Sequence, residues 1–187
     1  MVLKESDSEL SRGDAAPEFE LTGTDGEPYT LDSFADNDAL LVVFTCNHCP
    51  YAQAKFEFLN DLAAEFDDAA VVGINPNANP EYPDDDFDSM VEFVDDGTID
   101  YDAYLYDETQ EVAREYGAVC TPDPFLFRRA DDEWQLAYHG RLDDALNPDD
   151  EPTEFYAREA IESVLAGDDV EHDDLPSRGC SIKWVDE

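Results

Sequence analysis

The chain has 187 residues, 42% of them hydrophobic, and a net charge of −39 from 49 acidic and 10 basic side chains. The length and the hydrophobic fraction indicate one domain with a core of its own and exclude a disordered acidic tail. The negative charge argues against binding to nucleic acid or to an anionic membrane, because both carry charge of the same sign. No apolar run approaches the roughly 18 residues of a membrane span, and residues 1–16 lack the apolar segment of a signal peptide. We therefore expect a cytoplasmic location.

The acidic residues are spread along the whole chain, and lysine occurs only as Lys4, Lys55 and Lys183. The resulting self-repulsion is screened in molar salt, where the Debye length is about 3 Å. The pattern therefore predicts a halophilic protein from a salt-accumulating cell. We expect the circular dichroism signal of secondary structure to be lost as salt is removed. A spectrum that stays the same from molar salt to dilute buffer would contradict this prediction.

The predicted elements alternate between short apolar strands and amphipathic helices, after a polar lead-in at residues 1–12. In chain order they are a hairpin of strands 19–21 and 29–31, strand 40–44, helix 50–66, strand 70–74, helix 87–97, strand 104–106, a short helix within 107–117, strands 125–127 and 134–138, and helix 153–166. This order predicts an α/β domain at residues 13–167, with a mixed central sheet flanked by helices. The tail, 168–187, has no periodicity and is expected to dock on the domain.

A Cys-Asn-His-Cys motif at residues 46–49, the CNHC motif, directly follows strand 40–44 and precedes Pro50. Proline suits the first turn of a helix, so the motif is placed at a strand-to-helix junction. The spacing lets both sulfurs meet across one turn and switch between dithiol and disulfide. The N–H groups that begin the helix favour a thiolate, which is the reactive species. In a reducing compartment such a pair indicates catalysis or metal binding more than a structural disulfide.

Within the motif we predict that Cys46 is the nucleophile and Cys49 the resolving cysteine. Cys46 would attack a disulfide and form a mixed disulfide, which Cys49 would break to release the product. His48 lies between them in sequence. As an imidazolium it would stabilise the Cys46 thiolate and make the pair a better oxidant. The alternative for His48 is an exposed turn residue without a catalytic role.

Four segments, in the same order, resemble signatures of the alkyl hydroperoxide reductase/thiol-specific antioxidant (peroxiredoxin-like) group of the thioredoxin-fold superfamily. They are Gly13–Leu21 with Asp25-Gly26 and Leu31–Phe34, then Cys46–Tyr51, then Cys120–Phe127, and finally Gly179–Trp184. The resemblance implies a thioredoxin-like fold with an N-terminal hairpin, and an exposed Cys46. It also implies a cis peptide between Thr121 and Pro122, in a loop that faces both cysteines and offers the Thr121 backbone to a substrate strand. Pro124 is the alternative position for this bend.

Two departures from the superfamily patterns bear on the reaction. Peroxiredoxins carry Pro-x-x-x-Thr-x-x-Cys around the peroxide-reacting cysteine, but Ala39 and Val43 hold the Pro and Thr positions counted from Cys46. Counted from Cys49, neither position matches either. Thioredoxins place a buried acid six residues before the first cysteine, where this chain has Leu40. The first departure disfavours a dedicated peroxidase, and the second means that any proton relay comes from elsewhere.

The remaining cysteines, Cys120 and Cys180, allow two interpretations. Cys120 stands two residues before Pro122 and should lie near the active site, while the tail that carries Cys180 has Ile182 and Trp184 to help it dock. One hypothesis pairs these two cysteines with each other or lets them relay electrons to the CNHC motif. The other treats Cys120 as a small packed hydrophobe and Cys180 as a free thiol.

Other polar residues are expected to be structural. The acidic runs Asp84–Asp86 and Asp143-Asp144 lack the Asp-x-Asp-x-Asp-Gly spacing of a calcium loop, so we expect solvated faces. His139 and His172 are expected at the surface or at strand ends.

The sequence thus predicts an enzyme, a thiol–disulfide oxidoreductase of redox homeostasis that uses Cys46 and Cys49. Its partners would be a protein or small-molecule disulfide and an upstream dithiol reductant, with no cofactor and no metal. One alternative is a peroxiredoxin-like antioxidant peroxidase that uses either cysteine. A second is a copper or zinc carrier with Cys46, His48 and Cys49 as soft ligands, although such a site would want a further ligand.

Overall fold

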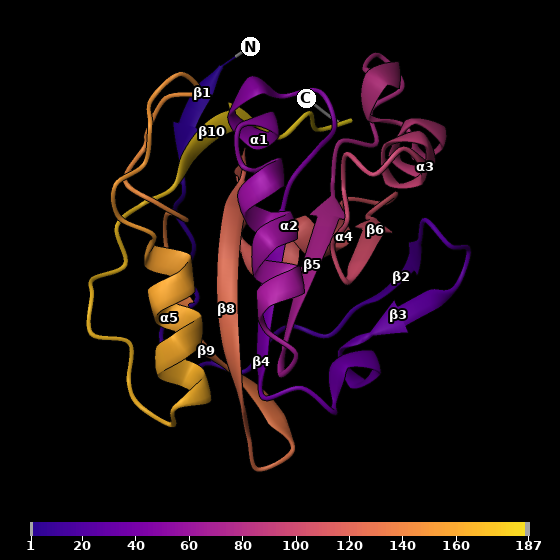
Figure 1. Cartoon of the computed structure of the whole chain (residues 1–187). Helices are drawn as coiled ribbons and strands as arrows, with labels where there is room; N and C mark the ends of the chain where they lie inside the picture. Colours follow the sequence, from indigo (N-terminus) through magenta and orange to yellow (C-terminus); the bar gives the residue numbers. More distant parts are fainter. Residues whose placement is uncertain (1, 186–187) are drawn as a thin grey trace.

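The computed structural model describes residues 2–185 (Figure 1). Its strands are β1 Leu3–Glu5, β2 Glu20–Gly23, β3 Pro28–Thr30, β4 Ala39–Phe44, β5 Ala69–Asn75, β6 Ala103–Tyr106, β7 Cys120–Thr121, β8 Asp123–Ala130, β9 Glu133–His139 and β10 Arg178–Ser181. Its helices are α1 Pro50–Gln53, α2 Phe56–Glu65, α3 Phe87–Asp95, α4 Glu111–Tyr116 and α5 Tyr156–Leu165, with 3-10 turns at Leu31–Phe34 and Pro83–Asp85.

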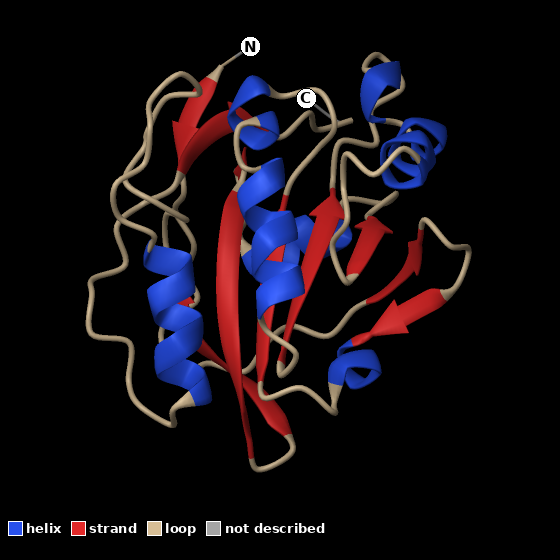
Figure 2. Cartoon of the chain, in the orientation of Figure 1, coloured by secondary structure: helices blue, strands red, loops and turns tan. Residues whose placement is uncertain are grey.

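A seven-stranded mixed sheet in the order β3-β2-β6-β5-β4-β8-β9 forms the centre of the molecule. The strands β4, β5 and β6 are parallel to one another, and the remaining pairings in this sheet are antiparallel. Helices cover both faces (Figure 2). The predicted α/β class with a mixed central sheet is confirmed.

The central strand β4 explains why a continuous apolar run is needed at this place. All six of its residues are buried. Leu40, Val42 and Phe44 pack in a core with α4, while Leu41 and Val43 pack in a second core with α2 and α5. Because successive side chains of a strand point to opposite faces, a strand covered on both sides must be apolar throughout.

The helix predicted at 50–66 is divided into α1 and α2 at Ala54 and Lys55. The Lys55 backbone N–H donates to the carbonyl of Ala52, three residues back, at 3.0 Å, so the chain makes a tight turn before α2 begins. The N-terminal hairpin is confirmed as β2 and β3, paired with Leu21 opposite Tyr29.

A second, three-stranded sheet in the order β1-β10-β7 was not predicted. It joins both ends of the chain to the segment before Pro122. In β10, Cys180 lies opposite Thr121 and Ser181 opposite Cys120, while Leu3 of β1 lies opposite Cys180. Figure 1 shows β1 and β10 at the same end of the molecule as α1, so the C-terminal strand lies beside the CNHC motif.

Candidate redox site

Three of the four cysteines gather at the carboxyl end of β4. Cys46, Cys49 and Cys180 belong to one buried cluster, with 1%, 4% and 2% of their surfaces exposed. Cys49 is joined to Cys180 by a disulfide with a Cα–Cα distance of 6.4 Å, while Cys46 and Cys120 are free buried thiols. The second cysteine of the motif is therefore bonded to the C-terminal strand in this structure, and not to the first.

The register of β10 explains this pairing. Cys180 lies opposite Thr121, so these two side chains share one face of the small sheet, whereas Cys120 points to the other face. The hypothesis of a Cys120–Cys180 bond is therefore wrong for this structure. The alternative of Cys180 as a free thiol is wrong as well, because its sulfur is bonded to Cys49.

The loop of residues 120–122, here called the cis-proline loop, faces both cysteines of the motif. The peptide bond between Thr121 and Pro122 is cis, as predicted, so Pro122 and not Pro124 makes the bend. The Cys46 Sγ atom lies 3.5 Å from the Thr121 hydroxyl oxygen. The Cys49 Sγ atom lies 3.7 Å from the Thr121 carbonyl oxygen. Thr121 therefore contacts both sulfurs of the motif.

A buried carboxylate, Asp85, binds the backbone of the motif. Only 2% of this residue is exposed. Its Oδ1 atom accepts hydrogen bonds from the N–H groups of Asn47 at 2.8 Å and His48 at 2.9 Å, and its Oδ2 atom accepts one from the Asn77 amide at 3.0 Å. The expectation that the run Asp84–Asp86 is a solvated face is therefore wrong for its middle residue, because two backbone donors and an amide hold the carboxylate inside.

Further polar side chains around the motif were also missed in the sequence. Tyr104 donates its hydroxyl to the Asn47 side chain at 2.8 Å, and the Asn75 amide donates to the Asp85 carbonyl at 2.7 Å. A signal for them exists, because Asn75 ends β5, a buried parallel strand next to β4, and Asn77 comes two residues later. The carboxyl ends of neighbouring parallel strands meet at one edge of the sheet, where functional side chains gather.

The environment of Cys46 disfavours its thiolate in this structure. Burial, followed by the nearby Asp85 carboxylate, raises the pKa of Cys46 from 9.0 to about 12, although the Thr121 hydroxyl acts in the opposite direction. The expectation of an exposed Cys46 with a low pKa is therefore wrong for this state. The N–H groups of Asn47 and His48 donate to Asp85, although the His48 and Cys49 backbone groups still act to lower the pKa of Cys46.

This raised pKa predicts a loss of stability at alkaline pH. The Cys46 thiol ionises near pH 9 in the unfolded chain but only near pH 12 in the folded one. The stability that it contributes is full below pH 9 and then falls by about 1.4 kcal/mol per pH unit toward pH 12. Buried tyrosines also contribute to the loss of stability at alkaline pH, so the measurement is the difference between the wild type and a variant without the Cys46 thiol. Denaturant unfolding between pH 8 and pH 11 should show a shallower decline for Cys46→Ser than for the wild type, and equal slopes would contradict this prediction.

The imidazole of His48 is at the surface. Its Nε2 atom lies 3.8 Å from an Asp84 carboxylate oxygen, with 61% and 76% of the two side chains exposed. The backbone of His48 and its side chain thus contact neighbouring acidic residues, Asp85 and Asp84 respectively.

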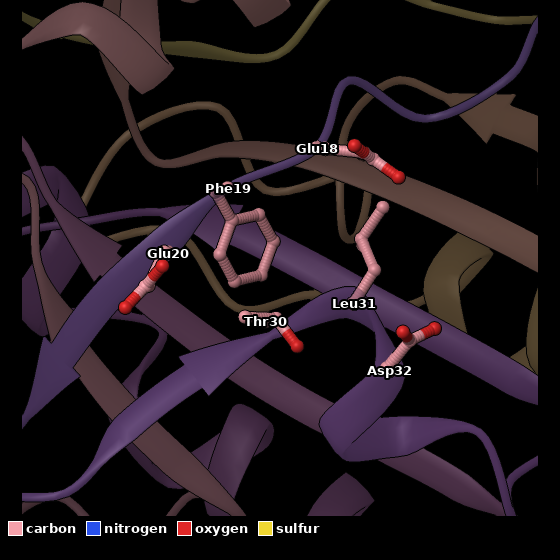
Figure 3. Close-up of a pocket in the computed structure, with 6 residues that line it drawn as sticks. All are labelled: Glu18, Phe19, Glu20, Thr30, Leu31 and Asp32. Carbon is pink, nitrogen blue, oxygen red and sulfur yellow. The ribbon is translucent and has the colours of Figure 1, made fainter.

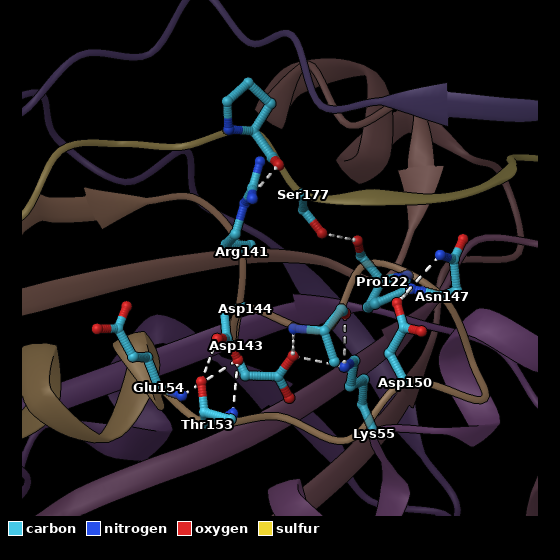
Figure 4. Close-up of polar contacts among 12 residues, drawn as sticks. Lys55, Pro122, Arg141, Asp143, Asp144, Asn147, Asp150, Thr153, Glu154 and Ser177 are labelled. Carbon is cyan, nitrogen blue, oxygen red and sulfur yellow. Dashed lines mark hydrogen bonds and ion pairs between the residues drawn. The ribbon is translucent and has the colours of Figure 1, made fainter.

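Two other acidic residues are buried ion-pair partners. Asp143 is paired with Lys55, whose Nζ lies 2.6 Å from its carboxylate (Figure 4), so the prediction of a solvated Asp143 is wrong. Asp123 is fully buried and lies 2.7 Å from the Nε2 atom of His139. Burial raises the pKa of Asp123, and His139 opposes that shift. His139 does end a strand, as expected, but it is buried and stacks on Phe125.

The described part of the chain, residues 2–185, contains no group of three or more His, Cys, Asp or Glu residues that could hold a metal ion. Within the same residues, no helix is long and apolar enough to cross a membrane. A hollow of about 390 Å³ lies where the chain enters β2 and leaves β3 (Figure 3). Neither cysteine nor histidine lines it; its lining residues are Glu18, Phe19, Glu20, Thr30, Leu31 and Asp32.

Fold and site together define an oxidoreductase of the thioredoxin fold, with a Cys-x-x-Cys turn facing a cis-proline loop. Residues 12–136 match the model of the AhpC/TSA family, and the chain belongs to that family. Comparison with curated proteins found no significant match. The predicted resemblance and the enzyme class are thus confirmed at the level of the family.

Two solved structures are similar over nearly the whole chain. A hypothetical protein from Sinorhizobium meliloti 1021 is 37% identical, with 96% of this chain and 97% of the other covered and a TM-score of 0.88. An uncharacterized conserved protein from Geobacillus kaustophilus is 35% identical, with 98% and 97% covered and a TM-score of 0.89. Peroxidoxin BcpB from Mycobacterium tuberculosis is 21% identical, with 84% and 97% covered and a TM-score of 0.60, which shows a shared fold. Thiol-disulfide oxidoreductases share the same fold at similar identity.

Proposed function

We propose that this chain is a thiol–disulfide oxidoreductase in which Cys46 attacks a disulfide and Cys49 resolves the intermediate. The observation that carries this proposal is the convergence of both sulfurs of the motif on Thr121, at 3.5 Å and 3.7 Å. The Thr121 backbone pairs with an antiparallel strand beside two neighbouring sulfurs, so the loop can align an extended substrate strand for in-line exchange. The disulfide at Cys49 supports the reactivity of this sulfur.

The proposed reaction balances as two exchanges. The Cys46 thiolate attacks one sulfur of the substrate disulfide, a mixed disulfide forms, and the departing sulfur takes up a proton. The Cys49 thiolate then attacks the Cys46 sulfur, so that a Cys46–Cys49 bond forms and the second substrate sulfur leaves as a thiol. Two electrons pass from the enzyme to the substrate, and an upstream dithiol reductant returns them. Protein and small-molecule disulfides both fit this chemistry.

Asp85 bears on the direction of electron flow. A carboxylate that disfavours the Cys46 thiolate destabilises the reduced pair relative to its disulfide, which makes the pair a better reductant. His48 as an imidazolium would act in the opposite direction, but its ring lies at the surface beside Asp84. We therefore propose that the enzyme reduces its substrates, that Thr121 and Pro122 position the bound strand, and that His48 as an imidazolium partly offsets the effect of Asp85 on the thiolate.

A thiol peroxidase is the second candidate, and the Cys49–Cys180 bond favours it. Peroxide would oxidise the Cys49 thiolate to a sulfenic acid with release of water or an alcohol, and the Cys180 thiol would condense with it to give the bond that is present. Against this candidate, the Asn47 and His48 N–H groups are engaged by Asp85 and are closed to a peroxide oxygen. Peroxide consumption that needs Cys49 and Cys180 but not Cys46 would establish it.

The proposed cellular setting follows from charge and composition. A net charge of −39 spread along the chain supports a halophilic origin, and the redox-active thiols support a reducing, cytoplasmic compartment. All activity assays should therefore be run in molar salt.

The test of the proposed function compares insulin-disulfide reduction and peroxide consumption in one preparation. We expect insulin reduction, driven by a dithiol, in the wild type and in Cys120→Ala, whose thiol points away from the motif. Peroxide turnover without disulfide reduction would overturn the proposal.

A further inference from the structure

The C-terminal strand β10 occupies the surface along the cis-proline loop where a substrate strand would lie. Its residue Cys180 is paired with Thr121 in antiparallel register. Just before β10, the Ser177 hydroxyl donates to the Pro122 carbonyl at 2.7 Å (Figure 4). A Cβ atom on Gly179 would overlap the Thr121 carbonyl, so the two backbones approach as closely as glycine permits. The chain's own tail therefore fills this position.

The covalent arrangement is that of a bound disulfide substrate. Cys180 stands in a strand paired with Thr121, and its sulfur is bonded to Cys49 of the motif. The thiol of Cys46 remains free and contacts the same threonine through its hydroxyl. The free thiol and the disulfide thus lie in one buried cluster, and Thr121, which is itself fully buried, contacts both sulfurs of the motif.

We propose that Cys180 is a third redox residue, which alternates with Cys46 as the disulfide partner of Cys49. The substrate position is closed when Cys49 is bonded to Cys180 and open when Cys49 is bonded to Cys46. The Cys46 thiolate attacks the Cys49 Sγ atom, the Cys46–Cys49 bond forms and the Cys49–Cys180 bond breaks. The electron pair leaves on the Cys180 sulfur, which takes up the proton that Cys46 released. No external oxidant or reductant is consumed. This inference rests on the proposed function, since it supplies the Cys46–Cys49 disulfide of that cycle.

The contacts beyond β10 keep the tail close after the exchange. The side chain of Gln110 donates to the Lys183 carbonyl at 2.9 Å and accepts from the Val185 N–H at 3.0 Å. The Asn77 side chain accepts from the Lys183 N–H at 3.0 Å, and Ile182 is buried. These residues anchor the tail on the far side of β10, so Cys180 can leave Thr121 and return without separation of the whole segment. The closed and open forms are thus two positions of one short strand.

The test maps the free thiol of the oxidised Cys120→Ala protein, in which one disulfide and one thiol remain. Samples in molar salt at neutral and mildly alkaline pH are quenched with acid, unfolded and blocked at low pH with methyl methanethiosulfonate, and peptic peptides are analysed by mass spectrometry. We expect the label to divide between Cys46 and Cys180 and to redistribute after a pH jump, because exchange requires a thiolate. A label confined to Cys46, or confined to Cys180, would overturn the proposal.

A non-cysteine variant tests the docking of β10 with the sulfurs intact. Gly179→Ala, made in the Cys120→Ala protein, should weaken the closed form and shift the label from Cys46 to Cys180, because the added methyl group meets the Thr121 carbonyl. Ser181→Ala in the same strand is the control, since it removes a hydroxyl and adds no atom, and it should leave the distribution unchanged. An unchanged distribution in Gly179→Ala would contradict the inference.

Insulin reduction separates this inference from the proposed function. The oxidised wild type should show a lag before turnover, and Cys180→Ser, which cannot close, should show none. Absence of insulin reduction in both proteins would overturn the proposed function, while the thiol map alone still decides whether the internal exchange occurs.

Discussion

Replacement of Cys46 by serine is expected to abolish insulin-disulfide reduction, because Cys46 is the sulfur that forms the mixed disulfide in the proposed cycle. Cys49→Ser should be equally inactive in turnover, since Cys46 then reacts once and lacks the resolving thiol of the proposed cycle. The measurement is steady-state insulin reduction in molar salt with a dithiol donor. Cys120→Ala is the matched control and should retain the activity, because Cys120 faces away from the motif.

The single variants also distinguish the two candidate functions. In the peroxidase cycle Cys46 has no part, so Cys46→Ser would keep full peroxide turnover and Cys180→Ser would lose its resolving thiol. Full insulin reduction by Cys46→Ser would refute the assignment of Cys46 as the nucleophile.

Neutralisation of Asp85 is expected to lower the pKa of Cys46 from its value of about 12, because this carboxylate is the second largest cause of the raised pKa, after burial. Asp85→Asn removes the charge and keeps an oxygen that can accept from Asn47 and His48. The pH dependence of ultraviolet thiolate absorbance in the reduced protein measures the shift, by difference from Cys46→Ser. Asp84→Asn makes the same chemical change at an exposed neighbour and should move the pKa far less.

Truncation of the same residue should be costly to the fold. Asp85→Ala leaves the N–H groups of Asn47 and His48 without an acceptor in a buried place. We expect a loss of about 2–4 kcal/mol in the free energy of unfolding. A stability equal to the wild type, or an unchanged thiol pKa in Asp85→Asn, would mean that Asp85 does not control the motif.

The position of the redox motif could be predicted from local signals. A six-residue buried strand, a Cys-x-x-Cys turn and a proline at the first helical position are each set by neighbours in sequence, and the structure has β4 and α1 in those places. The cis peptide before Pro122 was predicted by resemblance alone, since most X–Pro bonds are trans.

The partner of Cys49 could not be predicted, because each of the other three cysteines is a possible partner and only the fold selects among them. The strand β10 has four residues and no apolar alternation, and it exists through pairing with β1 and β7, which are shorter still, with three and two residues. The buried position of Asp85 could not be predicted for a related reason. Its acidic neighbours, Asp84 and Asp86, favour the prediction of a solvent-exposed run, and its backbone partners lie nearly forty residues earlier in the chain.

The most direct test of the proposed oxidoreductase is capture of its covalent intermediate. Cys49→Ser combined with Cys180→Ser leaves Cys46 without a resolving thiol, and reaction with a disulfide-bonded peptide in molar salt can be followed by mass spectrometry of the intact protein and of its peptides. We predict one peptide chain attached to Cys46 through a disulfide, with release of the other chain as a thiol. An unmodified Cys46, together with an adduct on Cys49 in the Cys46→Ser, Cys180→Ser protein, would contradict the assignment.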